Sequence, residues 1–372
     1  MNEINIYVGL DVHKETIAVA LAEAGRQGEV RFYGTIANNA QAIQKLTTKL
    51  KKLHGALEYV YEAGPCGYAL YRQMTALGET CHVVAPSTIR KSPTDRIKND
   101  HRDAMTLARL SRAGELTSVW VPDETHEAMR DLVRARQVAS CDMKAARQRI
   151  QSFLLKYNRR YDDGKVWTRR HQLWLANQQF PLAAQQITFQ IYINALEQAM
   201  DRRTQVEDQI RQLCASWTLG PVVESLQALR GVALVVAVTT VAEVGDFTRF
   251  TNPKQLMAYL GLIPGEHSSG SKIRPRGITK TGNSALRTLL YEAAWNYTRR
   301  PKTAAYTLVN RPLVIQSAKD IAWKAQLRLS TRYKNLIAAG KKSQVAITAV
   351  ARELVGFMWA IARQVPPSAV TI

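Results

Sequence analysis

The sequence predicts an α/β domain built on a mixed sheet, followed by a long helical, coiled-coil-like region and a mostly α-helical C-terminal domain. The first hundred residues alternate between strand-like and helix-like patterns, whereas from Glu124 onward apolar residues recur at helical spacing over long stretches. Of the 372 residues, 46% are apolar and 22% are charged. This length and composition suffice for packed cores in two or three domains.

The N-terminal domain is predicted from the order of its elements. Strand patterns rich in β-branched and aromatic residues come first, and the second follows the first closely enough to be its hairpin partner. The predicted elements are strands at 5–12, 16–21 and 30–36, a helix at 39–53, a strand at 56–61, a helix at 67–77, a strand at 81–84 and a helix starting near residue 100. Three consecutive strands followed by strand–helix units predict a mixed sheet with helices on its faces.

Two long helices are predicted in the middle of the chain, at 124–156 and about 181–217, with a turn at 158–165. The apolar spacing of the second is too irregular for a clean heptad repeat, so it fits a helical hairpin within one domain as well as a dimerisation arm. Further on, helical segments are predicted at 226–244, 284–297 and 345–362, and a Gly/Ser/Pro/Lys-rich loop at 261–282. The predicted domains are residues 1–155, 156–220 and 221–372.

The net charge of +21, from 51 basic and 30 acidic side chains, indicates a polyanionic partner. Residues 221–372 hold 21 of the basic and only 7 of the acidic residues, so this part of the chain is expected to bind phosphate groups. A membrane is not expected, because the most apolar stretch, 231–244, is too short to span a bilayer. The N-terminus lacks a signal-peptide pattern, which predicts a cytoplasmic protein. Scattered Cys and His residues predict reduced thiols and no zinc site.

Four acidic residues stand where strands and helices of the first domain end or begin. Asp11 lies in the first strand, Glu62 ends the fourth, and Asp100 and Asp103 share one face at the start of a helix. Singly, they fit a turn residue, a strand-end surface residue, a helix cap and a first-turn acid. Together they form the pattern of a ribonuclease-H-like nuclease site, which gathers carboxylates to hold two divalent cations at a phosphate. Mg²⁺ suits such oxygen ligands best, and Mn²⁺ is a possible substitute.

These motifs carry a resemblance to a known family. GLDVHKE, YEAGPCGY and KNDHRDAMTLARL resemble the DEDD tetrad of insertion-sequence transposases related to the Piv-type DNA invertase, which act as bridge-RNA-guided serine recombinases. The stretch MAYLGLIPGEHSSGSKIRPRGITKTGNSALRTLLYEAAW resembles the second block of that family. The resemblance covers most of the chain and implies a RuvC-like (RNase-H-like) fold for the first domain, with Asp11, Glu62, Asp100 and Asp103 as catalytic metal ligands.

The Gly/Ser-rich loop carries the second set of candidate residues. A loop with several hydroxyls and cations suits phosphate binding, although it also fits a solvated surface loop. By resemblance, Ser269 is the nucleophile toward the DNA phosphate, with Ser268 and Ser271 as alternatives. A serine hydroxyl needs a base or a metal for activation, and metal held by the tetrad is the economical choice. The predicted nucleic-acid-binding residues are Lys272, Arg274, Arg276, Lys280 and Arg287.

The leading interpretation is therefore a DNA transposase or site-specific recombinase that cuts and rejoins donor and target DNA through a phosphoserine link. The resemblance further implies an element-encoded guide RNA and a dimer or tetramer in which the tetrad of one subunit faces the serine of another. Two alternatives remain: a junction-resolving nuclease that uses water as nucleophile, and a non-catalytic nucleic-acid-binding protein whose acids pair with Lys98, Arg102 and Arg109. The expected location is the cytoplasm, on the nucleoid when the protein acts.

Overall fold

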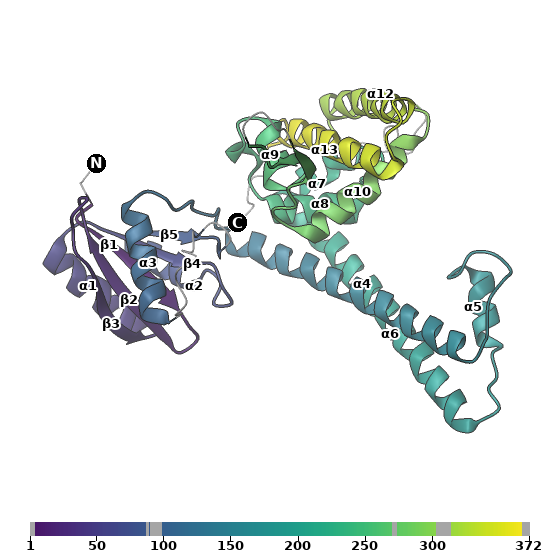
Figure 1. The fold of residues 1–372 in the computed structure, drawn as a ribbon, viewed down its shortest axis with the longest axis horizontal. Coiled ribbons are helices and arrows are strands. Elements are labelled where there is room, and N and C mark those ends of the chain that lie inside the picture. Colours follow the sequence, from purple (N-terminus) through teal and green to yellow (C-terminus); the bar gives the residue numbers. More distant parts are fainter. Residues whose placement is uncertain (1–3, 87–88, 90–98, 270–273, 303–313, 367–372) are drawn as a thin grey trace. The chain divides into compact units, whose positions relative to one another are not determined.

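The chain folds into two compact units, Met1–Val121 and Pro122–Ile372, in the computed structural model (Figure 1). The structure describes residues 4–86, 89, 99–269, 274–302 and 314–366. The first predicted domain boundary, at residue 155, falls inside a continuous helix of the second unit. The division into three domains stays a prediction.

In its described residues, the first unit is a five-stranded mixed sheet with three helices, as predicted. Its strands are β1 (Ile6–Val12), β2 (Thr16–Glu23), β3 (Val30–Ala37), β4 (Leu57–Glu62) and β5 (Thr80–Val84). Its helices are α1 (Ala40–His54), α2 (Ala69–Ala76) and α3 (Asp100–Arg112). The strand order is β3-β2-β1-β4-β5. The β1–β2 and β2–β3 pairs are antiparallel, and the β1–β4 and β4–β5 pairs are parallel.

The two faces of the sheet differ in side-chain size because β2 alternates large and small residues. Ile17, Val19 and Leu21 belong to the same buried cluster as apolar side chains of α1 and α2. Ala18, Ala20 and Ala22 instead cluster with the alanines of α3. Since successive side chains of a strand point to opposite faces, α3 covers the small-residue face and the other two helices cover the large-residue face. A helix can approach a sheet closely only over small residues, so this alternation determines how near α3 lies.

The second unit is mostly helical. Its helices are α4 (Glu124–Lys156), α5 (Arg169–Ala176), α6 (Ala183–Ser216), α7 (Gly220–Leu226), α8 (Leu234–Val244), α9 (Pro253–Tyr259), α10 (Ser284–Ala294), α12 (Gln316–Ala338) and α13 (Ser343–Ala362). Short 3₁₀ turns cover Phe247–Arg249 and Trp295–Thr298, and β6 (Pro264–Glu266) and β7 (Pro275–Ile278) form a small antiparallel pair. The two long predicted helices are confirmed as α4 and α6, which lie side by side along their length (Figure 1).

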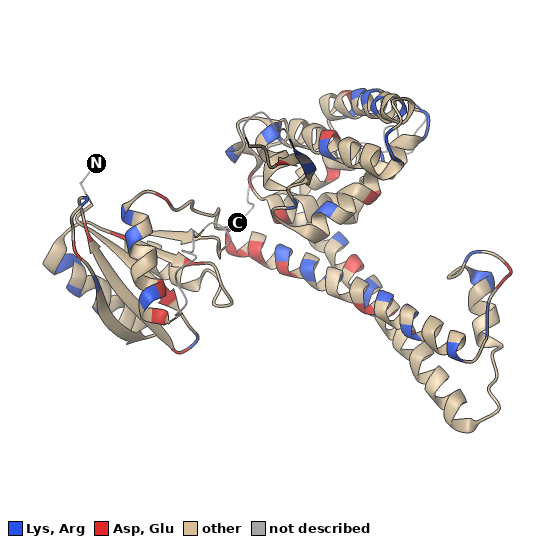
Figure 2. Ribbon diagram, in the orientation of Figure 1, with Lys and Arg blue, Asp and Glu red and all other residues tan. Residues whose placement is uncertain are grey.

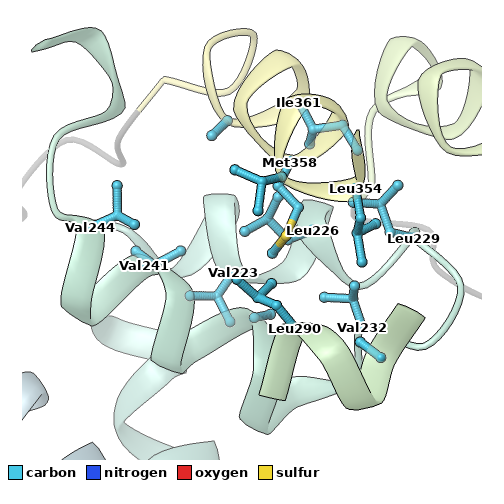
Figure 3. Close-up of a cluster of buried hydrophobic side chains, with 14 of the residues drawn as sticks. Val223, Leu226, Leu229, Val232, Val241, Val244, Leu290, Leu354, Met358 and Ile361 are labelled. Carbon is cyan, nitrogen blue, oxygen red and sulfur yellow. The ribbon is translucent and has the colours of Figure 1, made fainter. Parts of the chain in front are cut away.

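The core of the second unit is made by α7, α8, α10, α12 and α13 around fully buried aliphatic side chains (Figure 3). Leu226, Leu229, Val241, Leu290 and Met358 are each completely covered. The N-terminal part of α4 and the C-terminal part of α6 contribute side chains to the same cluster, so the long α4–α6 hairpin is anchored in this core. Burying a side chain of this size contributes about 1.5–3 kcal/mol, and the cluster therefore accounts for much of the stability of the unit.

Two local predictions for the second unit were wrong, and one of its helices was not predicted. The segment 226–244 is not one helical stretch: α7 ends at Leu226 and α8 begins at Leu234. Gly231 between them has a φ of +82°, and a Cβ there would lie 2.5 Å from the carbonyl oxygen of Ala293, so only glycine fits. The loop 261–282 contains the β6–β7 pair. Helix α12, whose Lys and Arg residues blur its apolar pattern, was not predicted.

Among the residues that the structure describes, one helix, α13, is long and apolar enough to span a membrane by length and composition, with a mean hydropathy of 1.6. Half of the residues in its apolar window are buried inside the unit, and its fully covered side chains include Ile347, Leu354 and Met358. A helix that is apolar because other helices surround it passes the same hydropathy test. The apolar stretch at 231–244 contains the shorter helix α8, which does not reach the length of a membrane span, as predicted.

Candidate nucleic-acid-processing site

Asp11 lies near the end of β1 on the face that α3 covers. In the β1 ladder, Gly9 and Asp11 share one face of the strand, because side chains alternate. A Cβ at Gly9 would lie 2.1 Å from the carbonyl oxygen of Ala104 and 2.5 Å from the amide nitrogen of Ala108. Helix α3 therefore rests directly on the backbone of β1, and its first turn lies near Asp11.

The first turn of α3 presents Asp100 and Asp103. The helix is capped by Asn99, whose side-chain oxygen accepts a 2.9 Å hydrogen bond from the amide of Arg102. Asp100 is therefore not the cap, although the sequence allowed that interpretation. Its carboxylate is available for other contacts. Both aspartates stand in the turn where the helix dipole favours negative charge.

His13 links the two segments. Its Nε2 lies 3.2 Å from Oδ2 of Asp11 and 3.5 Å from Oδ1 of Asp100. Burial raises the pKa of Asp11; His13 counteracts this through its charge and its hydrogen bond, and the carboxylates of Asp100 and Asp103 raise the pKa further. Two segments thus bring three predicted acids into one electrostatic group, and a histidine bridges two of them.

Glu62 lies at the same edge of the sheet as Asp11, at the end of β4. The parallel β1–β4 ladder pairs Leu10 with Tyr61, so Asp11 and Glu62 lie one position beyond its last pair. Leu10 and Tyr61 are both buried in the cluster on the α1 side, which directs the next residue of each strand to the α3 face. The Glu62 side chain is exposed and lies outside the Asp11–His13–Asp100 group.

This group has the composition of a divalent-cation site. One ligand atom each from Asp11, His13 and Asp100 lies within 4.8 Å of the others. Burial, and to a smaller extent the carboxylates of Asp100 and Asp103, raise the pKa of Asp11; a bound cation would favour its charged form, so the residues fit such an ion. Carboxylate oxygens suit Mg²⁺ and Mn²⁺.

The serine loop is partly outside the described residues. Strands β6 and β7 form a hairpin in which His267 N–H donates to the carbonyl of Arg274 at 3.0 Å. Ser268 Oγ donates to Glu266 Oε1 at 2.6 Å and accepts from Arg274 N–H at 3.1 Å, so this hydroxyl holds the hairpin together. The Ser269 side chain is exposed. Ser271 and Lys272 lie outside the described residues.

The predicted phosphate-binding cations of this region differ in their surroundings. Arg274 and Lys280 are exposed, and Lys280, two residues before Gly282, has a φ of 59°. Arg276 lies within β7, and its side chain is exposed. Arg287 is half-buried, and its Nη1 donates to the carbonyls of Leu260, Thr281 and Gly282. These hydrogen bonds stabilise the end of the loop at Thr281 and Gly282.

Comparisons with known proteins identify the family. The family model described as "Transposase IS116/IS110/IS902 family" matches residues 223–308, and a DEDD transposase model of the IS110 type matches residues 8–159. A Sinorhizobium fredii protein called "Putative transposase y4qE" is 50% identical over 362 residues, 96% of this chain and 88% of its own. The chain belongs to the IS116/IS110/IS902 transposase family. The transposase for insertion sequence element IS1533 of Leptospira borgpetersenii is 33% identical over 91% of this chain and 98% of its own.

Both matched stretches contain the predicted site residues of this IS110-type transposase. Asp11, Glu62, Asp100 and Asp103 fall within the DEDD match, and Ser269 falls within the second. The expected family of DEDD insertion-sequence transposases is thereby confirmed, and such transposases typically use a divalent metal. The transposase for insertion sequence element IS1111A of Coxiella burnetii is a more distant relative, 27% identical over 62% of this chain.

Sequence reasoning missed His13. The residue was part of the motif GLDVHKE, yet only its acid received a role. The signal that could have found it is the spacing: His13 stands two residues after Asp11, so an extended backbone puts both side chains on one face. A histidine two positions from a half-buried carboxylate is a natural partner for it.

Proposed function

We propose that the protein is the enzyme that cuts and rejoins DNA during transposition of an insertion sequence, with a RuvC-like (RNase-H-like) first domain. The observation that carries the proposal is the meeting of Asp11, Asp100 and Asp103 on one face of the sheet, with Glu62 ending the adjacent parallel strand. Family membership supplies DNA as the substrate class. Asp11, Glu62, Asp100 and Asp103 would hold Mg²⁺, or Mn²⁺ in its place, and the ion would stabilise charge on the reacting phosphate.

In this proposal Ser269 is the nucleophile. Its Oγ forms a bond to phosphorus, the phosphorus–oxygen bond to the leaving strand end breaks, that end takes up a proton as a hydroxyl, and the serine proton passes to solvent. The phosphoserine link retains the energy of the broken phosphodiester, so the reverse attack by a strand end rejoins DNA without another energy source. Ser268 is less suitable because its hydroxyl already holds the hairpin through Glu266 and Arg274.

A denaturation-resistant protein–DNA adduct tests the nucleophile. Full-length protein is incubated with Mg²⁺, labelled donor DNA and the RNA that co-purifies with it, and adducts are resolved on a denaturing gel. Ser269→Ala should abolish the adduct and strand exchange, whereas Ser268→Ala should weaken both without removing the adduct. Cleavage that continues unchanged in Ser269→Ala would replace this proposal with the hydrolytic, junction-resolving reaction in which water attacks. An adduct lost only in Ser271→Ala would move the nucleophile by two residues.

A purely binding role for the acids has little support. That alternative requires the carboxylates to pair with neighbouring cations, yet within the described ranges neither Asp100 nor Asp103 forms an ion pair with Arg102 or Arg109. Lys98 lies outside the described residues. Asp11→Asn should abolish cleavage while DNA affinity remains. Equal cleavage by Asp11→Asn and wild type would exclude the catalytic role of the cluster.

The remaining parts of the proposal concern partners. We include an element-encoded guide RNA and a dimer or tetramer in which the acids of one subunit act with Ser269 of another, in the cytoplasm on nucleoid DNA. Exposed apolar residues on the α4–α6 hairpin, Leu155, Ile187 and Ile191, favour its use as a subunit contact. Recombination that resists ribonuclease treatment would exclude the guide. Mixing Asp11→Asn with Ser269→Ala protein should restore activity if the sites are composite.

A further inference from the structure

Helix α3 carries both acidic and basic residues (Figure 2). Asp100 and Asp103 occupy the first turn, beside the alanines that contact the sheet. Arg102 and Arg109 follow another stripe, because residues three, four and seven positions apart share a helix face. Between them lie Met105 and Thr106, and these four residues line a surface groove together with Val30 of β3.

The two arginines of this groove have no structural task in the described part of the chain. Both side chains are exposed, and neither forms an ion pair or hydrogen bond with a described residue. Arg112, one turn further along, is different: its Nη1 donates to the carbonyl of Gly28 at 2.6 Å and of Glu23 at 3.2 Å, which fastens the β2–β3 turn to α3. The fold thus uses one arginine of the helix for stability and leaves two at the groove.

Placing arginines beside a carboxylate cluster has an electrostatic consequence. Asp11, Asp100 and Asp103 repel the DNA phosphate that the proposed reaction must bring to them. Guanidinium groups grip phosphate oxygens through paired N–H donors and do not lose their charge at any working pH. Seven residues of helix rise span about 10 Å, which corresponds to about three nucleotides of rise along one strand of duplex DNA.

We propose that Arg102 and Arg109 bind the backbone of the DNA strand whose phosphate reacts at the acidic cluster, on the side of α3 that faces β3. The inference rests on the proposed function and names two positioning residues for it. The occupant is duplex DNA, since the groove lies on the same helix as the acids that act on DNA. The groove has an apolar floor from Val30 and Met105, over which a strand can lie between the two cations.

Salt-dependent binding tests the assignment. Donor duplex affinity of the full-length protein is measured between 50 and 300 mM salt for Arg102→Gln, Arg109→Gln and the double variant. Each neutralised phosphate contributes about 0.9 to the slope of log affinity against log salt, so the double variant should lose about two. Lys45→Gln with Lys52→Gln is the matched control, because these exposed residues of α1 lie on the opposite face of the sheet and should leave affinity unchanged.

Three further measurements keep the outcomes separate. Arg102→Lys with Arg109→Lys should recover the slope, and the melting temperature should not change in any groove variant. Asp11→Asn should retain the wild-type salt slope but not cleave DNA. If this variant still cleaves, the proposed function is contradicted, and the assignment of the groove is not affected. A double Gln variant that binds DNA like the α1 control, or that loses affinity for RNA alone, would overturn the assignment.

Discussion

At the scale of single residues, the acidic site depends on how Asp11 keeps its charge. Its carboxyl is about four-fifths covered, with a side-chain exposure of 19%, and burial raises its pKa. His13 is the neighbour that opposes this change, through a 3.2 Å contact that also lies 3.5 Å from Asp100. The histidine therefore fixes the separation of two carboxylates that come from different segments.

We predict that His13→Ala weakens metal binding without unfolding the first unit. Loss of the bridge leaves Asp11 and Asp100 to repel each other, and the removal of a residue that orients metal ligands typically costs 10–100-fold in affinity. Calorimetric titration with Mn²⁺, and the Mg²⁺ concentration for half-maximal cleavage, should both shift by about that factor. His54→Ala, at the end of α1, is the control. Unchanged Mn²⁺ affinity in His13→Ala would show that the bridge has no part in the site.

At the scale of elements, the distance between α3 and β1 sets the geometry of the site. Gly9, Ala104 and Ala108 allow the two backbones to touch, and this contact brings the first turn of α3 to Asp11. Small residues that face each other across a helix–sheet contact are thus as necessary for the cluster as its carboxylates.

We predict that the variant Gly9→Ala moves α3 away from β1. Its Cβ would lie 2.1 Å from a backbone oxygen of α3, which cannot swing away as a side chain can, so the helix must move. We expect a loss of about 1–3 kcal/mol in the free energy of unfolding and a larger relative loss of cleavage. Gly64→Ala, where the nearest atom is 3.9 Å away, should change the stability little. Denaturant titration measures the first effect, and retention of wild-type stability in Gly9→Ala would contradict the close contact.

At the scale of the whole molecule, the sequence predicted the order of elements better than their contacts. The alternation of TIAVALAE and the helical spacing of α4 and α6 depend on neighbours in sequence, so they could be recognised. Asp11, Glu62, Asp100 and Asp103 were predicted as site residues from their places at element ends, and that assignment stays a prediction. The His13 bridge, the role of Gly9 and the structural use of Ser268 and Arg287 depend on contacts between distant segments or across a turn, and no local pattern encodes those.

The last prediction concerns the stability of the full chain against pH. His126 is 2% exposed, its Nε2 donates to the carbonyl of Ala242 at 2.8 Å, and burial lowers its pKa; burial also lowers the pKa of His171. Below about pH 6.5 the two histidines therefore bind protons more readily in the unfolded chain than in the folded chain. Their contribution to the free energy of unfolding is complete above that pH and is lost as the pH drops. The loss is up to about 1.4 kcal/mol per pH unit for each histidine. His126→Gln keeps an N–H donor but does not titrate, and its melting temperature should fall less than that of wild type between pH 7.5 and 5.5, whereas His54→Gln should follow wild type. Equal falls in all three proteins would show that His126 does not resist protonation in the folded chain.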